Sequence, residues 1–83
     1  MLFVFPTQVR YFFTMAPMRF ALDVILIDER GEVVEVIEKA QPGVPNLAVS
    51  NPYKYVLELN AGTVHAHGIR VGDGMRATGI GRP

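Results

Sequence analysis

The chain has 83 residues, of which 49% are hydrophobic, and its 8 basic and 8 acidic residues give a formal net charge of zero. A chain of this length has room for one core, so we expect residues 1–83 to form a single domain. The balanced, scattered charge argues against a basic face for nucleic acid or for an anionic membrane surface. The chain has no cysteine, which excludes disulfides and thiolate metal sites.

The N-terminal segment is rich in β-forming residues. Residues 2–5 predict a short buried strand that ends at Pro6, and residues 9–15 predict a second β-type segment after a turn. This start is too short and too interrupted for a secretory signal, and no apolar run approaches the roughly 18 residues of a membrane span. We therefore expect a cytoplasmic protein without a membrane partner.

Residues 18–28 form the strongest β pattern of the chain. Apolar residues alternate along one face, and the far end is apolar on both faces, which indicates burial on both sides. Residues 28–31 predict a tight turn in which Gly31 supplies the positive φ. Residues 32–40 alternate again, so the sequence predicts a β-hairpin over residues 18–40.

The second half contains a long loop and another strand. Residues 41–52 include three prolines and predict a loop, and loops of this length often carry function. Residues 53–59 alternate cleanly and predict a half-buried strand. One face of this strand is expected to hold Tyr53, Tyr55, Leu57 and Leu59.

The C-terminal part predicts one short helix and one strand. Thr63 is expected to cap a single helical turn at residues 64–67, which Gly68 ends. Residues 75–78 predict a last strand, and residues 79–83 a frayed tail. The fold class is therefore all-β, a small barrel or sandwich of about five to seven strands with one short helix.

Four segments, in order, resemble the bacterial and archaeal family called domain of unknown function 192. They are residues 1–6 (MLFVFP), 13–34 (beginning FTMAPMRFALD and ending DERGEVV), 55–62 (YVLELNAG) and 68–73 (GIRVGD). Together they cover nearly the whole chain. The resemblance implies a compact β-rich fold with one short helix, no established enzyme activity, and members both with and without export signals.

Two departures from the family pattern bear on function. Relatives usually carry an extra N-terminal stretch ending in a Gly-Leu-Met-type motif, and this chain either is naturally short or has its start placed late. Without that N-terminal stretch, one edge of the sheet would be uncovered. Uncovered edges pair with other chains, so we expect a homodimer. Many relatives have lysine and asparagine at Ala16 and Pro17, and proline at Ala21, so a function relying on that lysine and asparagine is not expected here.

The most specific motif lies beside the longest loop, and we expect a ligand between residues 13–23 and residues 41–52. The candidate binding residues are Met15, Met18, Arg19, Asp23 and Asn51. Methionine adapts to varied ligands, and a carboxylate in a hydrophobic strand can orient one. The alternatives are core filling by the methionines and a structural role for Asp23, which would accept hydrogen bonds from loop amides or pair with Arg19.

The histidines do not predict a metal site. His65 and His67 lie on the expected helix, where a spacing of two points them about 200° apart. A zinc site needs three or four ligands, so we expect exposed histidines, no metal and no cofactor. Ser50 and Thr63 form no nucleophile constellation with them, and no catalytic residue is assigned.

Three functions remain after this survey. The first is a non-enzymatic binding module for a small polar ligand or a protein partner. The alternative is a structural or assembly protein that acts through an uncovered sheet edge. The least favoured is an enzyme that uses Asp23 with Arg19 or a histidine.

Overall fold

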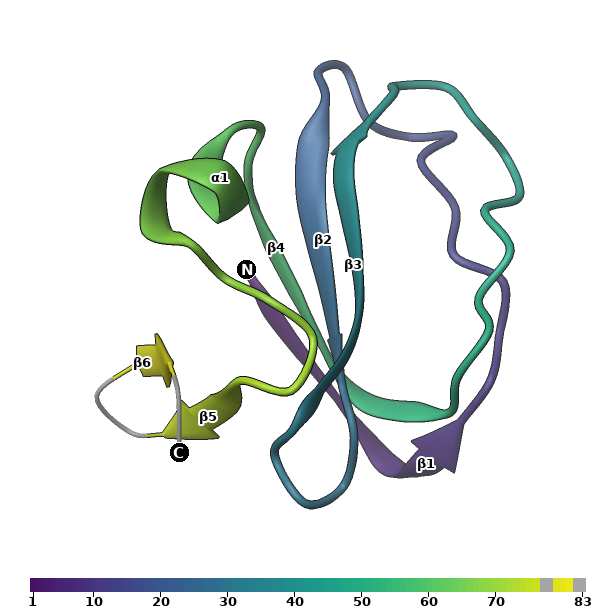
Figure 1. The fold of residues 1–83 in the computed structure, drawn as a ribbon. Helices are drawn as coiled ribbons and strands as arrows, with labels where there is room; N and C mark the ends of the chain where they lie inside the picture. Colours follow the sequence, from purple (N-terminus) through teal and green to yellow (C-terminus); the bar gives the residue numbers. More distant parts are fainter. Residues whose placement is uncertain (77–78, 82–83) are drawn as a thin grey trace.

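A computed structural model describes residues 1–76 and 79–81, which form six strands and one short helix (Figure 1). In chain order these are β1 (Leu2–Val9), β2 (Leu22–Ile27), β3 (Val33–Ala40), β4 (Tyr53–Asn60), α1 (Thr63–His67), β5 (Gly74–Arg76) and β6 (Gly79–Gly81). The β-rich class with one short helix is thereby confirmed. Across the described residues, no helix has the length and apolar character needed to span a membrane.

The main sheet has four antiparallel strands in the order β1-β4-β2-β3, and β5 and β6 form a separate two-stranded sheet. The central strand β2 pairs with β4 in unbroken register from Leu22 opposite Asn60 to Ile27 opposite Tyr55. The sheet stays open, so the barrel expected as one alternative is wrong. Four strands are too few to curl round until the two edges, β1 and β3, meet.

Both faces of the sheet are covered, by different parts of the chain. In Figure 1, α1 and the β5–β6 pair lie on one side of the sheet, and the segments before β2 and after β3 lie on the other. Alternate residues of β2 consequently enter two separate cores, with Val24 and Leu26 in one and Ile25 and Ile27 in the other. Every residue of β2 is buried, which confirms the expectation of burial on both sides.

The predicted hairpin is confirmed as β2 and β3, but its first strand begins at Leu22, so the prediction was wrong for residues 18–21, which form no strand. Its turn is held by Asp28, whose Oδ1 accepts hydrogen bonds from the amides of Arg30 and Glu32, both at 2.9 Å. The amide of Gly31 donates to the Asp28 carbonyl at 3.0 Å, with Gly31 at a φ of 86°. This positive φ is the conformation for which glycine was expected at the turn.

The N-terminal prediction was wrong in three places. The strand expected to be buried is largely exposed, with Leu2, Phe3 and Val4 all exposed at the edge of the sheet. β1 continues through Pro6 to Val9 instead of ending at Pro6. An edge strand is hydrogen-bonded on one side, and the register of β1 shifts between Val4 and Val9, so a proline there disturbs the ladder little. Residues 9–15 form no second strand, because the chain leaves the sheet and pairs only at Phe13, with Leu47 of the loop.

Residues 10–21 and 41–52 together form the layer that we call the covering loops. The absence of a strand in residues 41–52 confirms the loop prediction. Four backbone hydrogen bonds of 2.7–3.0 Å join the two segments. Phe13 and Leu47 exchange two of them, the Met15 amide donates to the Val44 carbonyl, and the Gly43 amide donates to the Met15 carbonyl. The covering loops are therefore tied to each other as well as packed on the sheet.

At the C-terminal end, the helix lies where it was expected but begins differently. Gly62, at a φ of 95°, occupies the N-cap position, and the hydroxyl of Thr63 instead donates to the Asn60 carbonyl at 2.6 Å. Gly68 ends the helix with a φ of 64°, as predicted.

Residues 79–81 are not a frayed tail. They form β6, which pairs with β5 through Met75 opposite Ile80. The expected strand over residues 75–78 corresponds to β5, and residues 77–78 and 82–83 lie outside the described part of the chain. Two glycines in the three residues of β6 explain why its sequence carried no strand signal.

Candidate functional site

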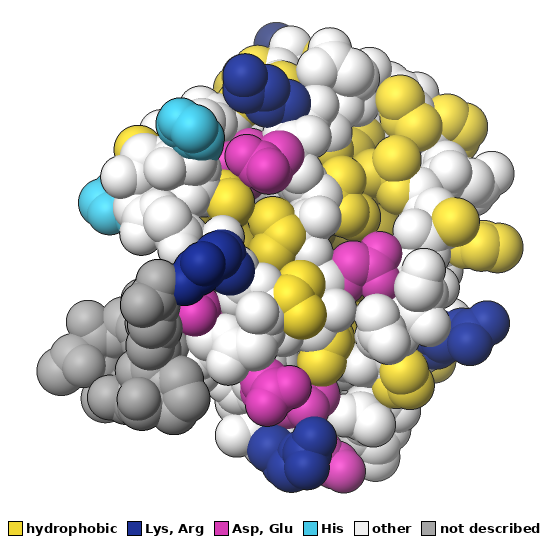
Figure 2. All heavy atoms as spheres, in the orientation of Figure 1, with side chains coloured by type: hydrophobic (Ala, Val, Ile, Leu, Met, Phe, Trp, Pro, Cys, Tyr) yellow, Lys and Arg dark blue, Asp and Glu magenta, His cyan; other side chains and the backbone are white. Residues whose placement is uncertain are grey.

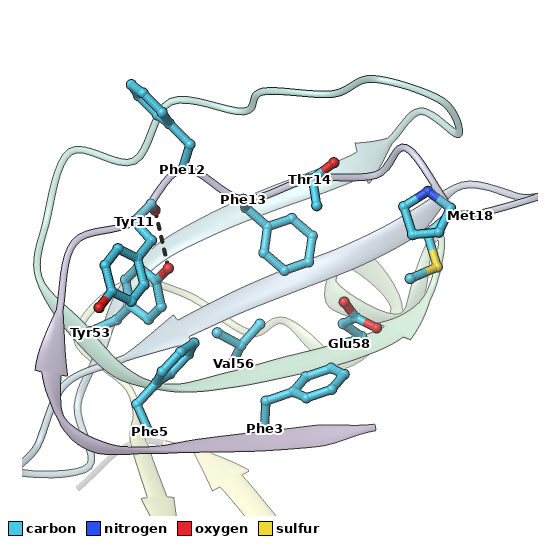
Figure 3. Close-up of a pocket in the computed structure, with 11 residues that line it drawn as sticks. Phe3, Phe5, Tyr11, Phe12, Phe13, Thr14, Met18, Tyr53, Val56 and Glu58 are labelled. Carbon is cyan, nitrogen blue, oxygen red and sulfur yellow. Dashed lines mark hydrogen bonds between the residues drawn. The ribbon is translucent and has the colours of Figure 1, made fainter.

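An apolar groove of about 310 Å³ opens between β1, β4 and the covering loops (Figure 3). We call it the aromatic groove, because six of its lining residues are phenylalanine or tyrosine. The lining residues are Phe3, Phe5, Tyr11, Phe12, Phe13, Thr14, Pro17, Met18, Tyr53, Val56 and Glu58. Its volume lies at the lower end of the range for small-molecule sites.

The floor of the aromatic groove follows from the pairing of two strands. Phe3 of β1 lies opposite Val56 of β4, so both side chains project from the same face of the sheet. Phe5, two residues further along β1, meets the rings of Tyr11 and Tyr53 edge-on, with centroids 5.9 and 5.7 Å away. These aromatic contacts fix one end of the groove.

Tyr53 ties the roof of the groove to its floor. Its side chain is 2% exposed, and its hydroxyl donates to the Tyr11 carbonyl at 3.1 Å (Figure 3). Burial raises the pKa of the Tyr53 hydroxyl above its ordinary value, so the group stays a neutral donor. The sequence had placed Tyr53 on the face of Tyr55 and Leu57, but it turns to the opposite core, where its hydroxyl finds this acceptor.

Glu58 is the one charged side chain among the residues that line the aromatic groove. In Figure 3 its carboxylate lies near the rings of Phe3 and Phe13 and the side chain of Met18. Burial raises the pKa of the Glu58 carboxyl above its ordinary value, and the positive charge of the Met1 amino group opposes this. The raised pKa reflects a carboxylate that has lost part of its water to apolar neighbours.

A second hollow of about 340 Å³, which we call the end hollow, adjoins the aromatic groove and shares Phe3, Met18 and Glu58 with it. The other residues that line the end hollow are Met1, Phe20, Leu22, Leu59 and Asn60. Glu58 therefore belongs to two apolar hollows that meet at its side chain.

Asp23 lies elsewhere and is fully buried on the face of β2 that α1 covers. Its Oδ1 accepts a hydrogen bond from the amide of Lys39 at 2.9 Å, and its Oδ2 accepts from the amides of Gly62 at 3.0 Å and Val64 at 2.8 Å. This arrangement is the one described by the structural alternative, with loop amides rather than Arg19 as partners. Both carboxylate oxygens are thus engaged within the fold.

The structure separates the other candidate binding residues. Met18 lines both hollows, whereas Met15 is fully buried under the covering loops. Arg19 is exposed and lines neither hollow. Asn51 is exposed and donates through Nδ2 to the Val34 carbonyl at 3.2 Å, which holds the loop on β3. Of the five residues, the structure brings only Met18 to the aromatic groove.

Sequence reasoning missed Glu58 and Phe3. Glu58 falls on the same strand face as Val56, so a charged residue next to a buried apolar one was a visible signal. The place of Glu58 in a groove could not be predicted without Phe3, which is more than fifty residues away in the chain. Phe3 joins the site only through the β1–β4 register.

The sequence of the chain matches a family model over residues 1–77. That family is DUF192, the domain of unknown function 192, with the description "Uncharacterized ACR". The chain belongs to DUF192. The resemblance carried by the four segments is thereby confirmed. A comparison with curated proteins gives no match.

Two solved structures share the fold of this DUF192 chain. A protein of unknown function from Novosphingobium aromaticivorans DSM 12444 superposes with a TM-score of 0.82 at 28% sequence identity. A protein from Sinorhizobium meliloti 1021, described as "a putative transcription regulator", superposes with a TM-score of 0.83 at 35% identity. Each match covers 89% of this chain but only 54% and 58% of the respective relative. This DUF192 chain thus spans little more than half the length of these relatives.

Apart from a single ion pair, charged side chains and histidines elsewhere in the described part of the chain lie apart from one another. On the face seen in Figure 2, lysine and arginine side chains lie apart, with acidic side chains between them. His65 and His67 are exposed on α1, as expected. Within residues 1–76 and 79–81, no three histidine or acidic side chains gather into a group able to hold a metal ion.

Proposed function

We propose that this DUF192 domain is a non-enzymatic binding module that holds a small ligand in the aromatic groove. The observation that carries the proposal is an apolar hollow whose aromatic walls are left open to water. Phe3 is 40% exposed, Tyr11 61% and Phe12 70%. Exposed apolar surface of this kind marks binding sites in monomeric proteins, because burying it against a ligand is favourable.

The ligand that suits these walls has an apolar body the size of one or two rings. The sequence predicts a small polar ligand or a protein partner between residues 13–23 and 41–52. Backbone hydrogen bonds join these two segments, however, and Met15 fills the space beneath them. The aromatic groove lies instead between residues 11–18 and strand β1.

The groove supports binding better than it supports a reaction. Its polar side-chain groups are the Thr14 and Tyr53 hydroxyls, the Tyr11 hydroxyl and the Glu58 carboxylate. Thr14 already accepts from the Ala16 amide at 3.1 Å, and Tyr53 donates to Tyr11. A general acid and base in mutual reach, or a nucleophile beside a base, is missing from this lining set.

A fragment titration tests this proposal. Thermal shift and calorimetry with a panel of one- and two-ring compounds should reveal at least one that raises Tm and binds the wild-type protein. Phe12→Ala should weaken that binding by roughly fivefold or more, because it removes an aromatic contact. Val71→Ala is the control and should bind like the wild type, since Val71 is 62% exposed and lines neither the aromatic groove nor the end hollow. Equal binding by the Phe12→Ala variant and the wild type would refute the placement of the site.

A second candidate function is assembly through the edge of β1. Strand β1 pairs with β4 on one side only, and Leu2 and Val4 on its far face are 47% and 61% exposed. The β3 edge is covered at its start, because Val33 exchanges hydrogen bonds with Gly72 and Asp73 at 2.8 Å each and the Val34 carbonyl accepts one from Asn51. An unprotected apolar edge favours strand addition by a second copy, which is the homodimer expected from the sequence.

The comparisons supply no further functional proposal. The description of the Sinorhizobium meliloti relative concerns a protein of which this chain covers 58%. A nucleic-acid surface would need clustered basic residues, and the 8 basic residues here are matched by 8 acidic ones. The cytoplasmic location expected from the sequence stays a prediction.

A further inference from the structure

Building on the proposed function, we infer that the ligand of the aromatic groove is a small organic cation, an amine or quaternary ammonium with an apolar body. The cationic group would lie against the Glu58 carboxylate at the junction of the aromatic groove and the end hollow. The apolar body would occupy the aromatic groove.

The Glu58 carboxylate forms no ion pair within the described residues, although the positive charge of the nearby Met1 amino group acts on it. The Arg30–Asp28 contact at 3.5 Å is the one ion pair within the described residues, so none of their cationic groups lies within ion-pair distance of the Glu58 carboxylate. The nearby Met1 amino group is engaged by the backbone, since it donates to the Glu58 carbonyl at 2.6 Å. The carboxylate oxygens are therefore free to receive a ligand.

The surroundings of Glu58 strengthen the case for a cation. Phe3, Phe13 and Met18 are its neighbours in Figure 3, and they replace part of its water with apolar surface. Partial desolvation of an unpaired carboxylate is unfavourable, and an opposite charge at the same place offsets it. The rings of Phe3 and Phe13 line the same groove, so they can add cation–π attraction for a cation bound there.

The same features select against other ligands. An anion in this groove would be repelled by Glu58 in a medium of low dielectric. A neutral ligand without a hydrogen-bond donor would cover the carboxylate further without giving it a partner, which carries the cost of an unsatisfied polar group. A neutral donor would give it a weaker hydrogen bond than a cation, which combines a charge-assisted hydrogen bond with attraction to the aromatic walls.

Three probes that differ in one group test the inference. 2-Phenylethylamine, 2-phenylethanol and phenylacetate share a ring and differ in charge at neutral pH. By calorimetry or NMR titration at low salt, the amine should bind roughly tenfold more tightly than the alcohol, and phenylacetate should bind most weakly. Glu58→Gln should lower the affinity for the amine to that for the alcohol and leave the alcohol unchanged.

A control variant distinguishes the effect of the Glu58 charge from the effect of a change in the net charge of the protein. Glu38→Gln removes the same charge from an exposed position on β3 and should leave the affinity for all three probes unchanged. Far-UV circular dichroism and Tm would show that Glu58→Gln still folds, which its similar shape favours.

Two outcomes would overturn the inference, and they differ in what they say of the proposed function. Equal affinity for amine and alcohol, with both weakened by Phe12→Ala, would exclude a cation preference and leave the binding module intact. Failure of the amine to bind, together with a fragment panel that finds no ligand for the groove, would remove the cation inference and the binding function together.

Discussion

Asp23 is a carboxylate inside the most apolar strand of the molecule, and its two oxygens accept hydrogen bonds from amides of β3, Gly62 and α1. One of its donors, Lys39, has a positive φ of 52°, which is uncommon for a residue other than glycine. The carboxylate compensates that backbone conformation by giving the Lys39 amide an acceptor. Asp23 thus links β2 to the end of β3 and to the start of the helix.

We expect Asp23→Ala to lower the free energy of unfolding by about 3 kcal/mol or more, because three amides lose a charged acceptor at once. Asp23→Asn should also destabilise, since its NH₂ group would face amide donors. Urea denaturation measures both changes. The exposed turn variant Glu29→Ala serves as the control and should stay within about 0.5 kcal/mol of wild type. A similarly small effect of Asp23→Ala would contradict the structural role.

The carboxyl of Glu58 allows a prediction about pH. Burial raises the pKa of Glu58 in the folded state, so folding favours the protonated form. The stability associated with this group is fully present below the pKa of the unfolded state and is lost as pH rises through the higher pKa of the folded state. Glu58→Gln, which cannot ionise, should therefore have a higher Tm than wild type at pH 7.

The same comparison at about pH 3.5 should show the two proteins with nearly equal Tm, because the wild-type carboxyl is then protonated in both states. Glu38→Gln, at an exposed position, corrects for the change in net charge. A lower Tm of Glu58→Gln than of wild type at pH 7 would show that the carboxylate is stabilised in the folded protein and not merely desolvated.

At the scale of elements, the pairing of β1 identifies which amides face its free edge. Met1 and Glu58 exchange both backbone hydrogen bonds, at 2.6 and 2.8 Å. In an antiparallel ladder such pairs alternate, so Phe3 also turns its amide toward β4, and Leu2 and Val4 turn theirs outward. Strand addition to β1 would use the amides of Leu2 and Val4.

If β1 joins a second copy, the wild-type protein should sediment as a dimer at tens of micromolar. Val4→Pro should sediment as a monomer with its fold retained, because proline removes an outward amide and leaves the β1–β4 ladder intact. Val4→Ala, which keeps the amide, should remain dimeric. Analytical ultracentrifugation gives the answer directly, and a monomeric wild type would exclude assembly through this edge.

The elements also show which parts of the fold sequence patterns can predict. The β2–β3 hairpin was predicted because its signals are local, namely alternation, a charged turn and Gly31. The strand prediction for residues 9–15 was wrong. Tyr11, Phe12 and Phe13 have high β propensity, but they line the aromatic groove instead of forming a strand. Propensity reports what a side chain favours locally, and here packing over the sheet decided the outcome.

The candidate site could not be predicted for a related reason. Its walls come from β1, the covering loops and β4, and they meet only through the register that sets Phe3 opposite Val56. Of the candidate binding residues predicted from the sequence, Met18 lines the groove, and its role in binding stays a prediction. The position of Glu58 beneath that surface needed the strand order β1-β4-β2-β3.

At the scale of the whole molecule, the aromatic groove exists because the layers on the two faces of the main sheet do not cover β1 completely. One sheet face is covered by loops and the other by α1 and the β5–β6 pair, which bury β2 completely. Neither layer extends fully over β1, where Met1, Leu2, Phe3 and Val4 remain exposed. The aromatic groove and the free edge of β1 are therefore neighbours on one strand. A ligand in the groove or a second chain at the edge would change access to the other.

The central claim, that the aromatic groove binds a small organic cation at Glu58, is tested most directly by an NMR titration of ¹⁵N-labelled protein with 2-phenylethylamine. We expect saturable shifts concentrated at the amides of Phe3, Phe13, Met18 and Glu58, with α1 unaffected and the shifts much reduced in Glu58→Gln. Shifts that gather on α1 or the β5–β6 pair, or that persist unchanged in Glu58→Gln, would contradict it.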